Sequence, residues 1–304
     1  MTIAIVGSTN IDLAIRVPHI CEKNETVIGS GSYEIFGGGK GANQAAAVAA
    51  AGGKASFISK VGVDAFGEQS MKGLIDAGVD CSHVIRDNNS ATGLAAILVD
   101  QNGDNAIAVA PGANEALTID DINAAESVIA DASHLVVQLE VPFDTVRHAM
   151  KLAAKHGTAV IFNPAPAPAA NEEFGPVTYF TPNEVEAAAL AGIPAEDENS
   201  LDKISAIFFD RGVENVIITL GARGCFVRSA KERIFIDPYR VDAVDTTGAG
   251  DTFNGFLAAA LSRGEALGQA AKYACAAAAL SVTRHGARTN LPTHDEVTDF
   301  MGRN

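Results

Sequence analysis

The sequence predicts an α/β protein of three layers, with helices on both faces of a mostly parallel central sheet. Short apolar runs alternate with longer segments whose apolar residues recur at helical spacing, as in strands joined by crossover helices. A hydrophobic content of 47% and a mean hydropathy of +0.14 exclude a disordered chain. The length of 304 residues, without repeats, low-complexity tracts or linkers, favours a single domain over residues 1–304.

The expected elements alternate along most of the chain. The first strand, residues 3–6, is an apolar run that ends at Gly7. Further strands are expected at residues 56–61, 135–139, 159–162, 178–180, 216–220 and 225–228. Helices are expected at residues 42–51, 67–77, 119–129, 143–155, 185–191, 200–210, 252–263 and 266–282.

Two segments alternate between apolar and polar residues and are expected to form strands outside the main sheet. The first is 12–36, in which the alternation continues through residues 26–33. The second comprises 93–99 and 106–110, and the Asn-Gly pair at residues 102–103 between them indicates a β-hairpin.

Composition restricts the partners of the chain. A formal net charge of −15 would repel a nucleic-acid backbone, so no nucleic-acid partner is expected. A small phosphorylated ligand stays compatible with this charge, because backbone N–H groups, a few cations and Mg²⁺ hold such anions locally. The longest apolar runs, 45–51 and 274–280, are far shorter than the roughly 18 residues of a membrane-spanning helix, so no membrane partner is expected.

The N-terminal residues and the cysteines predict a cytoplasmic location. No basic leader or apolar signal region precedes residues 3–7. The four cysteines occur singly, which argues against a zinc site and against a disulfide framework.

Residues 248–251 place two glycines and a carboxylate where a loop turns into the helix expected at 252–263. A helix N-terminus leaves backbone N–H groups unpaired, and glycines let that backbone close on a bulky anion. Spacing alone leaves two interpretations of Asp251 equally open: an ionisable group that acts in catalysis, or a cap of the helix.

Two long motifs give the chain a specific resemblance. Residues 245–253, Asp-Thr-Thr-Gly-Ala-Gly-Asp-Thr-Phe, resemble the C-terminal signature of the PfkB, or ribokinase-like, carbohydrate kinases. Residues 38–44, Gly-Gly-Lys-Gly-Ala-Asn-Gln, resemble the N-terminal signature of that family and follow its usual opening, Gly-Ser-Thr-Asn-Ile-Asp, at 7–12. The resemblance covers nearly the whole chain, with further matches at residues 138–140, 163–167, 181–186, 219–224 and 286–288.

This resemblance implies an ATP-dependent kinase that phosphorylates the primary hydroxyl of a pentose, most simply D-ribose to D-ribose 5-phosphate. It also implies Mg²⁺ and K⁺ as cofactors, and a small β-sheet lid from about residues 12–37 and 92–111 through which a homodimer forms. A lid serves phosphoryl transfer because it excludes water as a competing acceptor. Deoxyribose, fructose-type sugars and nucleosides are the alternative substrates within the family.

The resemblance further implies roles for individual residues. Asp251 would be the general base, and the backbone of 249–251 would form an anion hole. The expected sugar contacts are Asn10, Asp12, Gly38, Gly39, Lys40, Asn43, Glu140 and Asp251. The expected ATP contacts are Asn183, Thr219, Gly221, Gly224, Ala249, Gly250 and Asp251. The expected K⁺ site comprises Asp245, Thr247, Ser281, Arg284, Gly286 and Asn290, where Asn290 replaces an expected Ser, and Glu186 would lie near Mg²⁺.

The glycine-rich segment 37–43 admits three interpretations. A Walker A loop is excluded because Lys40 is followed by Gly41 rather than by Ser or Thr. A dinucleotide-binding turn is disfavoured because the segment follows the outlying strands rather than the first buried strand. A sugar-binding turn that opens the helix 42–51 fits best, although a merely tight helix entrance would use the same glycines.

Some of these residues would suit purely structural roles equally well. Asn10 and Asp12 would serve in a strand-end turn, and Asn183 with Glu186 would serve as an ordinary helix cap. Gly221 and Gly224 would serve in a hairpin.

Two different functions are disfavoured by the glycine motifs. A nicotinamide-dependent oxidoreductase would need further glycines that residues 7–10 lack. A sugar-binding regulator without catalysis would have no need of the intact residues 248–251.

Overall fold

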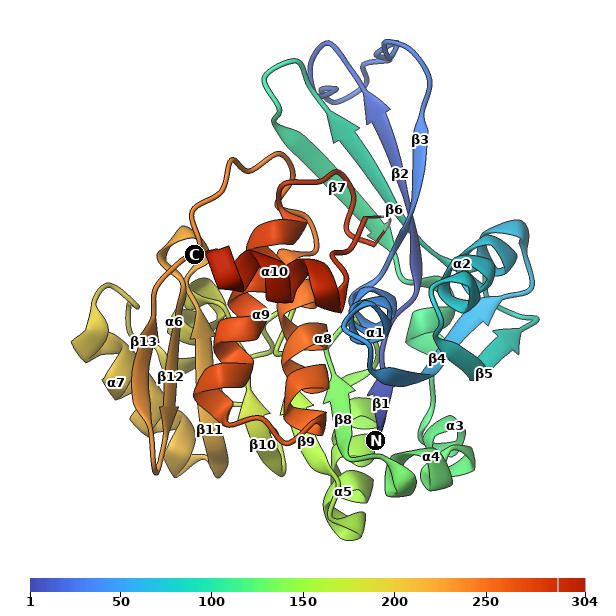
Figure 1. Cartoon of the computed structure of the whole chain (residues 1–304). Coiled ribbons are helices and arrows are strands. Elements are labelled where there is room, and N and C mark those ends of the chain that lie inside the picture. The colour runs from blue at the N-terminus through green and yellow to red at the C-terminus, as the bar shows by residue number, and fades with distance from the viewer. Residues whose placement is uncertain (289, 304) are drawn as a thin grey trace.

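The computed structural model describes residues 1–288 and 290–303. Two sheets organise this part of the chain (Figure 1). The large sheet has nine strands in the order β13-β12-β11-β10-β9-β8-β1-β4-β5, and the small one has four in the order β3-β2-β6-β7.

The large sheet is parallel from β5 to β11, as the sequence predicts. Strand β12 pairs antiparallel with both of its neighbours, β11 and β13. The first strand lies between β4 and β8. The polar residues that follow it therefore leave the sheet at the carboxyl ends of parallel strands, where α/β proteins bind ligands. The strands are β1 (Thr2–Val6), β4 (Lys54–Gly62), β5 (Asp80–Asp87), β8 (His134–Val137), β9 (Ala159–Phe162), β10 (Val177–Phe180), β11 (Val213–Thr219), β12 (Cys225–Ser229) and β13 (Arg233–Ile236).

Helices cover both faces of the large sheet, each over its own apolar core, which confirms the predicted three layers. One face carries α1 (Lys40–Ala50), α2 (Ala65–Asp76), α8 (Ala249–Ser262), α9 (Leu267–Ser281) and α10 (His294–Arg303). The other carries α3 (Ile119–Ala124), α4 (Glu126–Asp131), α5 (Phe143–His156), α6 (Glu184–Ala191) and α7 (Glu198–Asp210). Two short 3₁₀ turns are η1 (Gly112–Ala116) and η2 (Gly221–Arg223).

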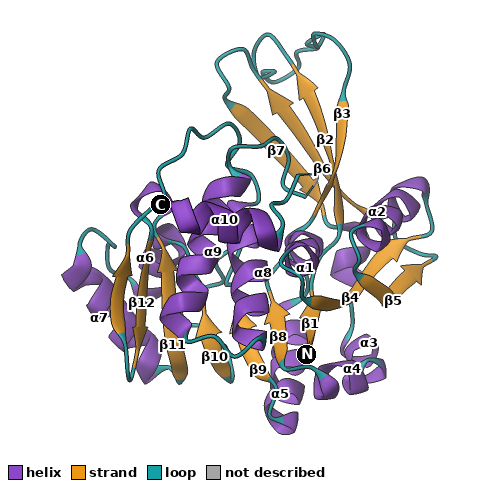
Figure 2. Cartoon of the chain, viewed as in Figure 1, coloured by secondary structure: helices purple, strands orange, loops and turns teal. Residues whose placement is uncertain are grey.

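The small sheet rises from one end of the molecule (Figure 2). It combines two separate segments of the chain, as predicted: β2 (Asn10–Arg16) with β3 (Glu34–Gly38), and β6 (Gly93–Val99) with β7 (Asn105–Ala110). Its central pair, β2 and β6, is parallel, and Asn10 pairs with Gly93 at the base of the sheet. The small sheet thus begins beside the carboxyl ends of the large one.

Some elements differ from the prediction. The alternating residues 26–33 form a loop rather than a strand, and Ile28 and Tyr33 in it are 85% and 63% exposed. Alternation predicts a strand only where a sheet face buries the apolar half, and here none does. The single helix expected at 119–129 breaks into α3 and α4 at Ala125 (φ −103°, ψ 13°). Strands β5 and β13 and helix α10 were not predicted.

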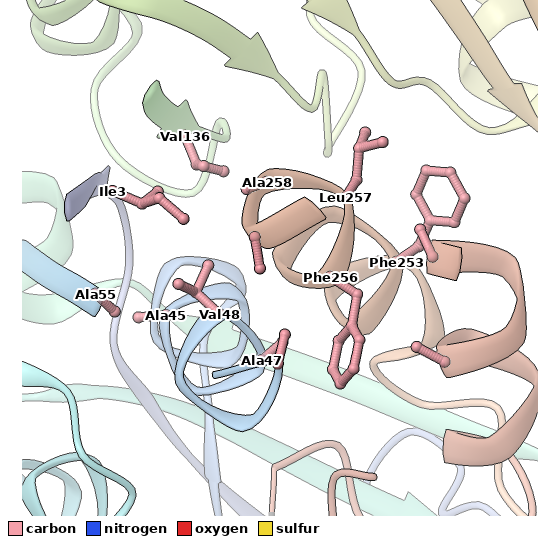
Figure 3. Packing of buried hydrophobic residues seen from close by; sticks show 14 of the residues in the cluster. Ile3, Ala45, Ala47, Val48, Ala55, Val136, Phe253, Phe256, Leu257 and Ala258 are labelled. Atoms are coloured by element: carbon pink, nitrogen blue, oxygen red, sulfur yellow. The ribbon is translucent and has the colours of Figure 1, made fainter. Parts of the chain in front are cut away.

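Close packing of α1 against α8 joins the two ends of the chain. Figure 3 shows Ala47 of α1 beside Phe256 of α8. A Cβ atom on Gly255 would lie 2.4 Å from the Cβ of Ala47, so the backbones approach more closely than a larger residue would allow. This contact brings the first turns of the two helices together.

Among the described residues, no helix has both the length and the apolar character that a membrane crossing requires.

Candidate active site

The carboxylate of Asp251 lies at the centre of the site. Helix α8 begins at Ala249, after Gly248, which has left-handed backbone angles (φ 75°). Asp251 is only 6% exposed, and its Oδ2 and Oδ1 accept hydrogen bonds of 3.0 Å each from Asn43 Nδ2 and Gln44 Nε2. The carboxylate does not cap its own helix, so the capping interpretation of Asp251 is wrong.

Opposing effects act on the pKa of Asp251. Burial raises this pKa above its ordinary value, while the Lys40 ammonium and the two amide donors oppose the increase. The resulting carboxyl is more basic than an exposed aspartate. The raised pKa counteracts the helix dipole, which alone would favour the ionised form of Asp251 and lower its basicity.

Asn10 and Asp12 lie at the junction of the two sheets. The Oδ1 atom of Asn10 accepts a 2.6 Å hydrogen bond from Asn114 Nδ2, and Asn114 also binds the N–H of Thr9. A partner 104 positions away, rather than a local turn, therefore fixes the Asn10 side chain. Asn114 follows a strand and a Pro-Gly pair, and nothing in its sequence context indicates this role.

The Asp12 carboxylate packs against Gly38, where a Cβ atom would lie 2.2 Å from Oδ1. Burial, assisted by the negative charge of Glu140, raises the pKa of Asp12 to about 6. The Arg288 guanidinium acts in the opposite direction, and burial lowers its own pKa to about 10. Asp12 is therefore an acceptor whose charge changes near neutral pH.

The turn that opens α1 is fixed by Glu140. Oε2 of this residue accepts hydrogen bonds from the Lys40 backbone N–H (2.9 Å) and from the Ser8 hydroxyl (2.6 Å). Gly39 adopts φ 88°, and a Cβ there would lie 2.7 Å from the Asn10 backbone nitrogen. The tight helix entrance therefore also brings together residues that the sequence predicts as sugar contacts. Burial lowers the pKa of the Lys40 ammonium, but the charges of Asp251, Glu140 and Glu186 outweigh this effect and raise it.

Two adjoining cavities contain the residues expected to bind ATP. A polar cavity of about 120 Å³ is lined by Lys40, Asn183, Glu186, Gly250 and Asp251, among others. An apolar cavity of about 540 Å³ is lined by Gly221 and Gly224 with residues from α8 and α9. Both cavities include Thr219, Thr246, Ala249 and Gly250. Larger hollows beside β12 and β13 contain none of the expected site residues.

Two pairs of site residues also have the structural roles that their spacing allows. Gly221 and Gly224 lie between the antiparallel strands β11 and β12, so they are hairpin glycines as well as cavity residues. Asn183 and Glu186 form a capping box: Asn183 Oδ1 accepts from the Glu186 N–H (2.8 Å), and Glu186 Oε2 accepts from the Asn183 N–H (2.9 Å). Burial raises the pKa of Glu186.

The expected cation residues gather in one loop region. The Asp245 carboxylate accepts 2.9 Å hydrogen bonds from the backbone N–H groups of Thr247 and Gly286. Burial raises the pKa of Asp245, but these two donors outweigh it and hold that pKa below its ordinary value. The Ser281 carbonyl accepts from the Arg284 N–H (3.1 Å), and Asn290 Nδ2 donates to the carbonyl of residue 285 (3.2 Å).

No group of three or more His, Cys, Asp or Glu side chains is placed to hold a metal ion within residues 1–288 and 290–303. A magnesium ion bound mainly through phosphates and water needs only one or two protein carboxylates. Glu186, on the wall of the polar cavity, fits that requirement.

Comparison with known proteins gives one family. The model described as pfkB family carbohydrate kinase matches residues 2–294. A ribokinase from Haemophilus influenzae is 41% identical over 302 residues, which cover 99% of this chain and 98% of the relative. The solved structure of a ribokinase from Thermotoga maritima has a TM-score of 0.90 and 36% identity, and the match covers 99% of both chains.

A second solved structure, a ribokinase from Arabidopsis thaliana complexed with ribose and ATP, has a TM-score of 0.89 at 29% identity over 98% of both chains. The family match spans nearly all of the chain and includes both glycine-rich motifs of the site. This chain therefore belongs to the pfkB family of carbohydrate kinases.

Proposed function

We propose that this sugar kinase transfers the γ-phosphoryl group of ATP to the primary hydroxyl of D-ribose, forming D-ribose 5-phosphate and ADP. The observation that carries the proposal is the position of Asp251, a buried carboxylate that contacts Asn43 and also lines the polar cavity beside the α8 N-terminus. The similarity to ribokinases, one of which was solved with ribose and ATP, supports the choice of substrate.

The sugar is held by polar groups from four segments of the chain, those of Asn10, Asn43, Glu140 and Asp251. Acceptors and donors at Asn10, Asp12 and Asn43 suit adjacent hydroxyls, because each buried polar group needs a partner. The Oδ1 atom of Asn43 is buried and has no hydrogen-bond partner among the residues that the structure describes, so a hydroxyl proton of the sugar would satisfy it. Gly38 leaves room for the Asp12 carboxylate, Gly39 leaves room for the backbone of Asn10, and Glu140 holds the turn that carries both glycines.

Asp251 removes the proton of the attacking hydroxyl as the phosphoryl group is transferred. Phosphoryl transfer needs positioning and neutralisation of charge more than covalent chemistry. Gly250 and Asp251 occupy the first turn of α8, whose N–H groups have no partner within the helix and so face the developing negative charge. The Ala249 N–H donates to the Thr246 carbonyl at 3.3 Å and would have to exchange that partner to join the anion hole.

ATP lies across the two cavities. Its base and ribose occupy the apolar cavity beside Gly221 and Gly224, and its phosphates extend past Thr219 and Asn183 to the polar cavity. Lys40 lines the polar cavity with a raised pKa, so its ammonium neutralises part of the phosphate charge.

Two cations complete the proposal. Mg²⁺ neutralises the phosphates when bound, and Glu186 would hold it through its water shell beside Asn183. K⁺ prefers oxygen ligands, which Asp245 and Thr247 offer with carbonyls near Ser281, Arg284 and Gly286. Asn290 turns its amide nitrogen to a loop carbonyl, so its contribution would come from its own carbonyl oxygens.

The small sheet acts as the lid and the dimer contact in a cytoplasmic enzyme. Ile107 and Val109 on its edge strand β7 are 57% and 59% exposed, and a second copy of the lid would cover them.

An activity panel with product identification tests the proposal. ADP release is measured by a coupled assay with D-ribose, 2-deoxy-D-ribose, D-fructose and nucleosides, and the products are examined by ³¹P NMR. We expect D-ribose to give the highest kcat/KM and a phosphomonoester on its primary hydroxyl. A higher kcat/KM for another acceptor, or ADP release without a phosphorylated sugar, would refute it.

A further inference from the structure

A chain of buried side-chain amides extends from Gln138, the residue after strand β8, to Asp251. Gln138 Nε2 donates to Gln44 Oε1 (2.6 Å), and Gln44 Nε2 donates to Asn163 Oδ1 (3.1 Å) and to Asp251 Oδ1 (3.0 Å). Gln44 and Gln138 are both 0% exposed. The family resemblance gives none of these three amides a role.

The orientation of the Gln44 amide is fixed from two sides. Asn163 Nδ2 donates to the carbonyl of Thr181 (2.9 Å), so its Oδ1 faces Gln44 and requires a donor there. Gln138 presents a donor to the oxygen of Gln44. A flipped Gln44 amide would place its oxygen against the Asp251 carboxylate and lose both partners.

Glycine makes room for this arrangement. A Cβ atom on Gly7 would lie 2.1 Å from Gln138 Oε1, so any side chain there would displace the glutamine. Gln138 Oε1 itself is buried, and within residues 1–288 and 290–303 it has no hydrogen-bond partner. A buried acceptor without a donor costs free energy. In this orientation Gln138 accepts that cost at Oε1 and keeps the hydrogen bond that its Nε2 donates to Gln44.

Gln44 cannot act by binding the substrate. Both N–H groups of its amide and its oxygen are engaged by protein atoms, and the residue is fully buried. Asn43, its neighbour on α1, donates to the other oxygen of Asp251, and its own buried Oδ1 accepts no hydrogen bond from the described part of the chain. The two consecutive amides therefore have different roles. Asn43 contacts Asp251 and can also contact the sugar, whereas Gln44 contacts Asp251 alone of these two.

We propose that Gln44 is the positioning residue of Asp251, and that Gln138 orients Gln44 for this task. The role rests on the proposed function, in which Asp251 is the base. One donor on each oxygen holds the carboxylate in a single orientation and favours its ionised form against the burial that raises its pKa. The charged groups that also act on Asp251 are Lys40, Glu140, Asp12 and Glu186, and none of them belongs to the amide chain.

The first test separates kcat from KM. Gln44→Met keeps the length of the side chain but removes its amide. We expect kcat to fall about 10- to 100-fold, which is the loss seen when residues that orient the ligands of a metal ion are replaced. KM for ribose should stay within about threefold of the wild-type value, because the sugar does not contact Gln44. Gln138→Met should lower kcat less, and the double variant should be no worse than Gln44→Met, since Gln138 acts through Gln44.

The second test does not need activity. The ¹³Cγ chemical shift of Asp251 is titrated in the wild type, in both single variants and in the control Thr145→Val, which loses a buried hydrogen bond to the Leu117 carbonyl on the opposite face of the sheet. The pKa of Asp251 should rise in Gln44→Met, rise less in Gln138→Met and stay unchanged in the control. If Gln44→Met fails to fold, Gln138→Met still decides the question through the same two measurements.

The outcomes distinguish the two proposals. A kcat within about twofold of the wild type in Gln44→Met, a change confined to KM, or an unmoved Asp251 pKa would overturn the positioning role. A wild-type protein that phosphorylates no sugar would instead refute the proposed function, and the titration would still report whether Gln44 controls Asp251.

Discussion

Asn43 and Asp251, 208 positions apart in the chain, meet in a hydrogen bond of 3.0 Å between Nδ2 and Oδ2. Each residue lies in the first turn of a helix, and the close packing of α1 against α8 at Gly255 holds the two turns together. The two glycine-rich motifs of the sequence are thus halves of one site. Substitutions at this contact should therefore change catalysis more than stability.

Asp251→Asn should lower kcat by about two to four orders of magnitude, which is the usual contribution of a general base. Steady-state kinetics check this, with a thermal melt to show that the fold survives. Asp144→Asn is a matched control, because Asp144 also occupies the first turn of a helix but lies far from the site. A variant at Asp251 that works at nearly the wild-type rate would show that this carboxylate is not the base.

Ribose binding should weaken in acid, because Asp12 has a pKa of about 6 and accepts hydrogen bonds best when ionised. The sign follows from the raised pKa: the carboxylate is charged above about pH 6 and gains a proton as the pH falls through that value. Calorimetric Kd values without ATP, from about pH 8 to about pH 5, check this. Asp12→Asn should bind weakly at every pH, and a flat profile in the wild type would exclude Asp12 as a sugar acceptor.

Ala279→Phe should raise KM for ATP by about tenfold or more and leave KM for ribose nearly unchanged, because Ala279 lines only the apolar cavity. Gln269→Phe is the control, an exposed position on the same helix outside that cavity. Gly224 is a poorer probe, since a Cβ there would lie 2.0 Å from the Ile236 carbonyl oxygen and would distort the hairpin. A larger increase in KM for ribose than in KM for ATP would show that the apolar cavity binds the sugar and not ATP.

Activity should be higher in K⁺ than in tetramethylammonium at matched ionic strength, because Asp245 and nearby carbonyls offer oxygen ligands to a small cation. Asp245→Asn should reduce the difference between the two salts. Initial rates across a K⁺ titration check this. Equal rates in both salts would show that no activating cation binds at this loop.

The sequence predicts the layers and the small sheet well, because these depend on local periodicity and on glycine positions. It fails at residues 26–33, where alternation continues without a sheet face to bury Ile28 and Tyr33. Strand β13 (Arg-Ile-Phe-Ile) was missed because four residues are too few to establish a strand periodicity, although three of them are apolar.

The site shows a similar limit. Asp251, Asn10 and Lys40 stand in motifs whose residue types suit kinase chemistry, so the sequence identifies them as candidates. The partners of these residues depend on packing between distant segments. Asn114 binds Asn10 from a position after β7, and Gln138, which follows β8, reaches Gln44 across a space that Gly7 leaves open. No local sequence pattern indicates contacts between residues so far apart in the chain, and only the folded structure shows them.

The ratio of kcat/KM for D-ribose to that for 2-deoxy-D-ribose tests the central claim most directly. Asn10 is buried and hydrogen-bonded to Asn114, and a sugar that lacks a hydroxyl would leave a polar group of the site unpaired. One such group costs about 1 to 3 kcal/mol, so D-ribose should be preferred by that amount at saturating MgATP and K⁺, and Asn10→Met should narrow the gap. A kcat/KM for 2-deoxy-D-ribose equal to or above that for D-ribose would contradict the assignment of D-ribose as the substrate.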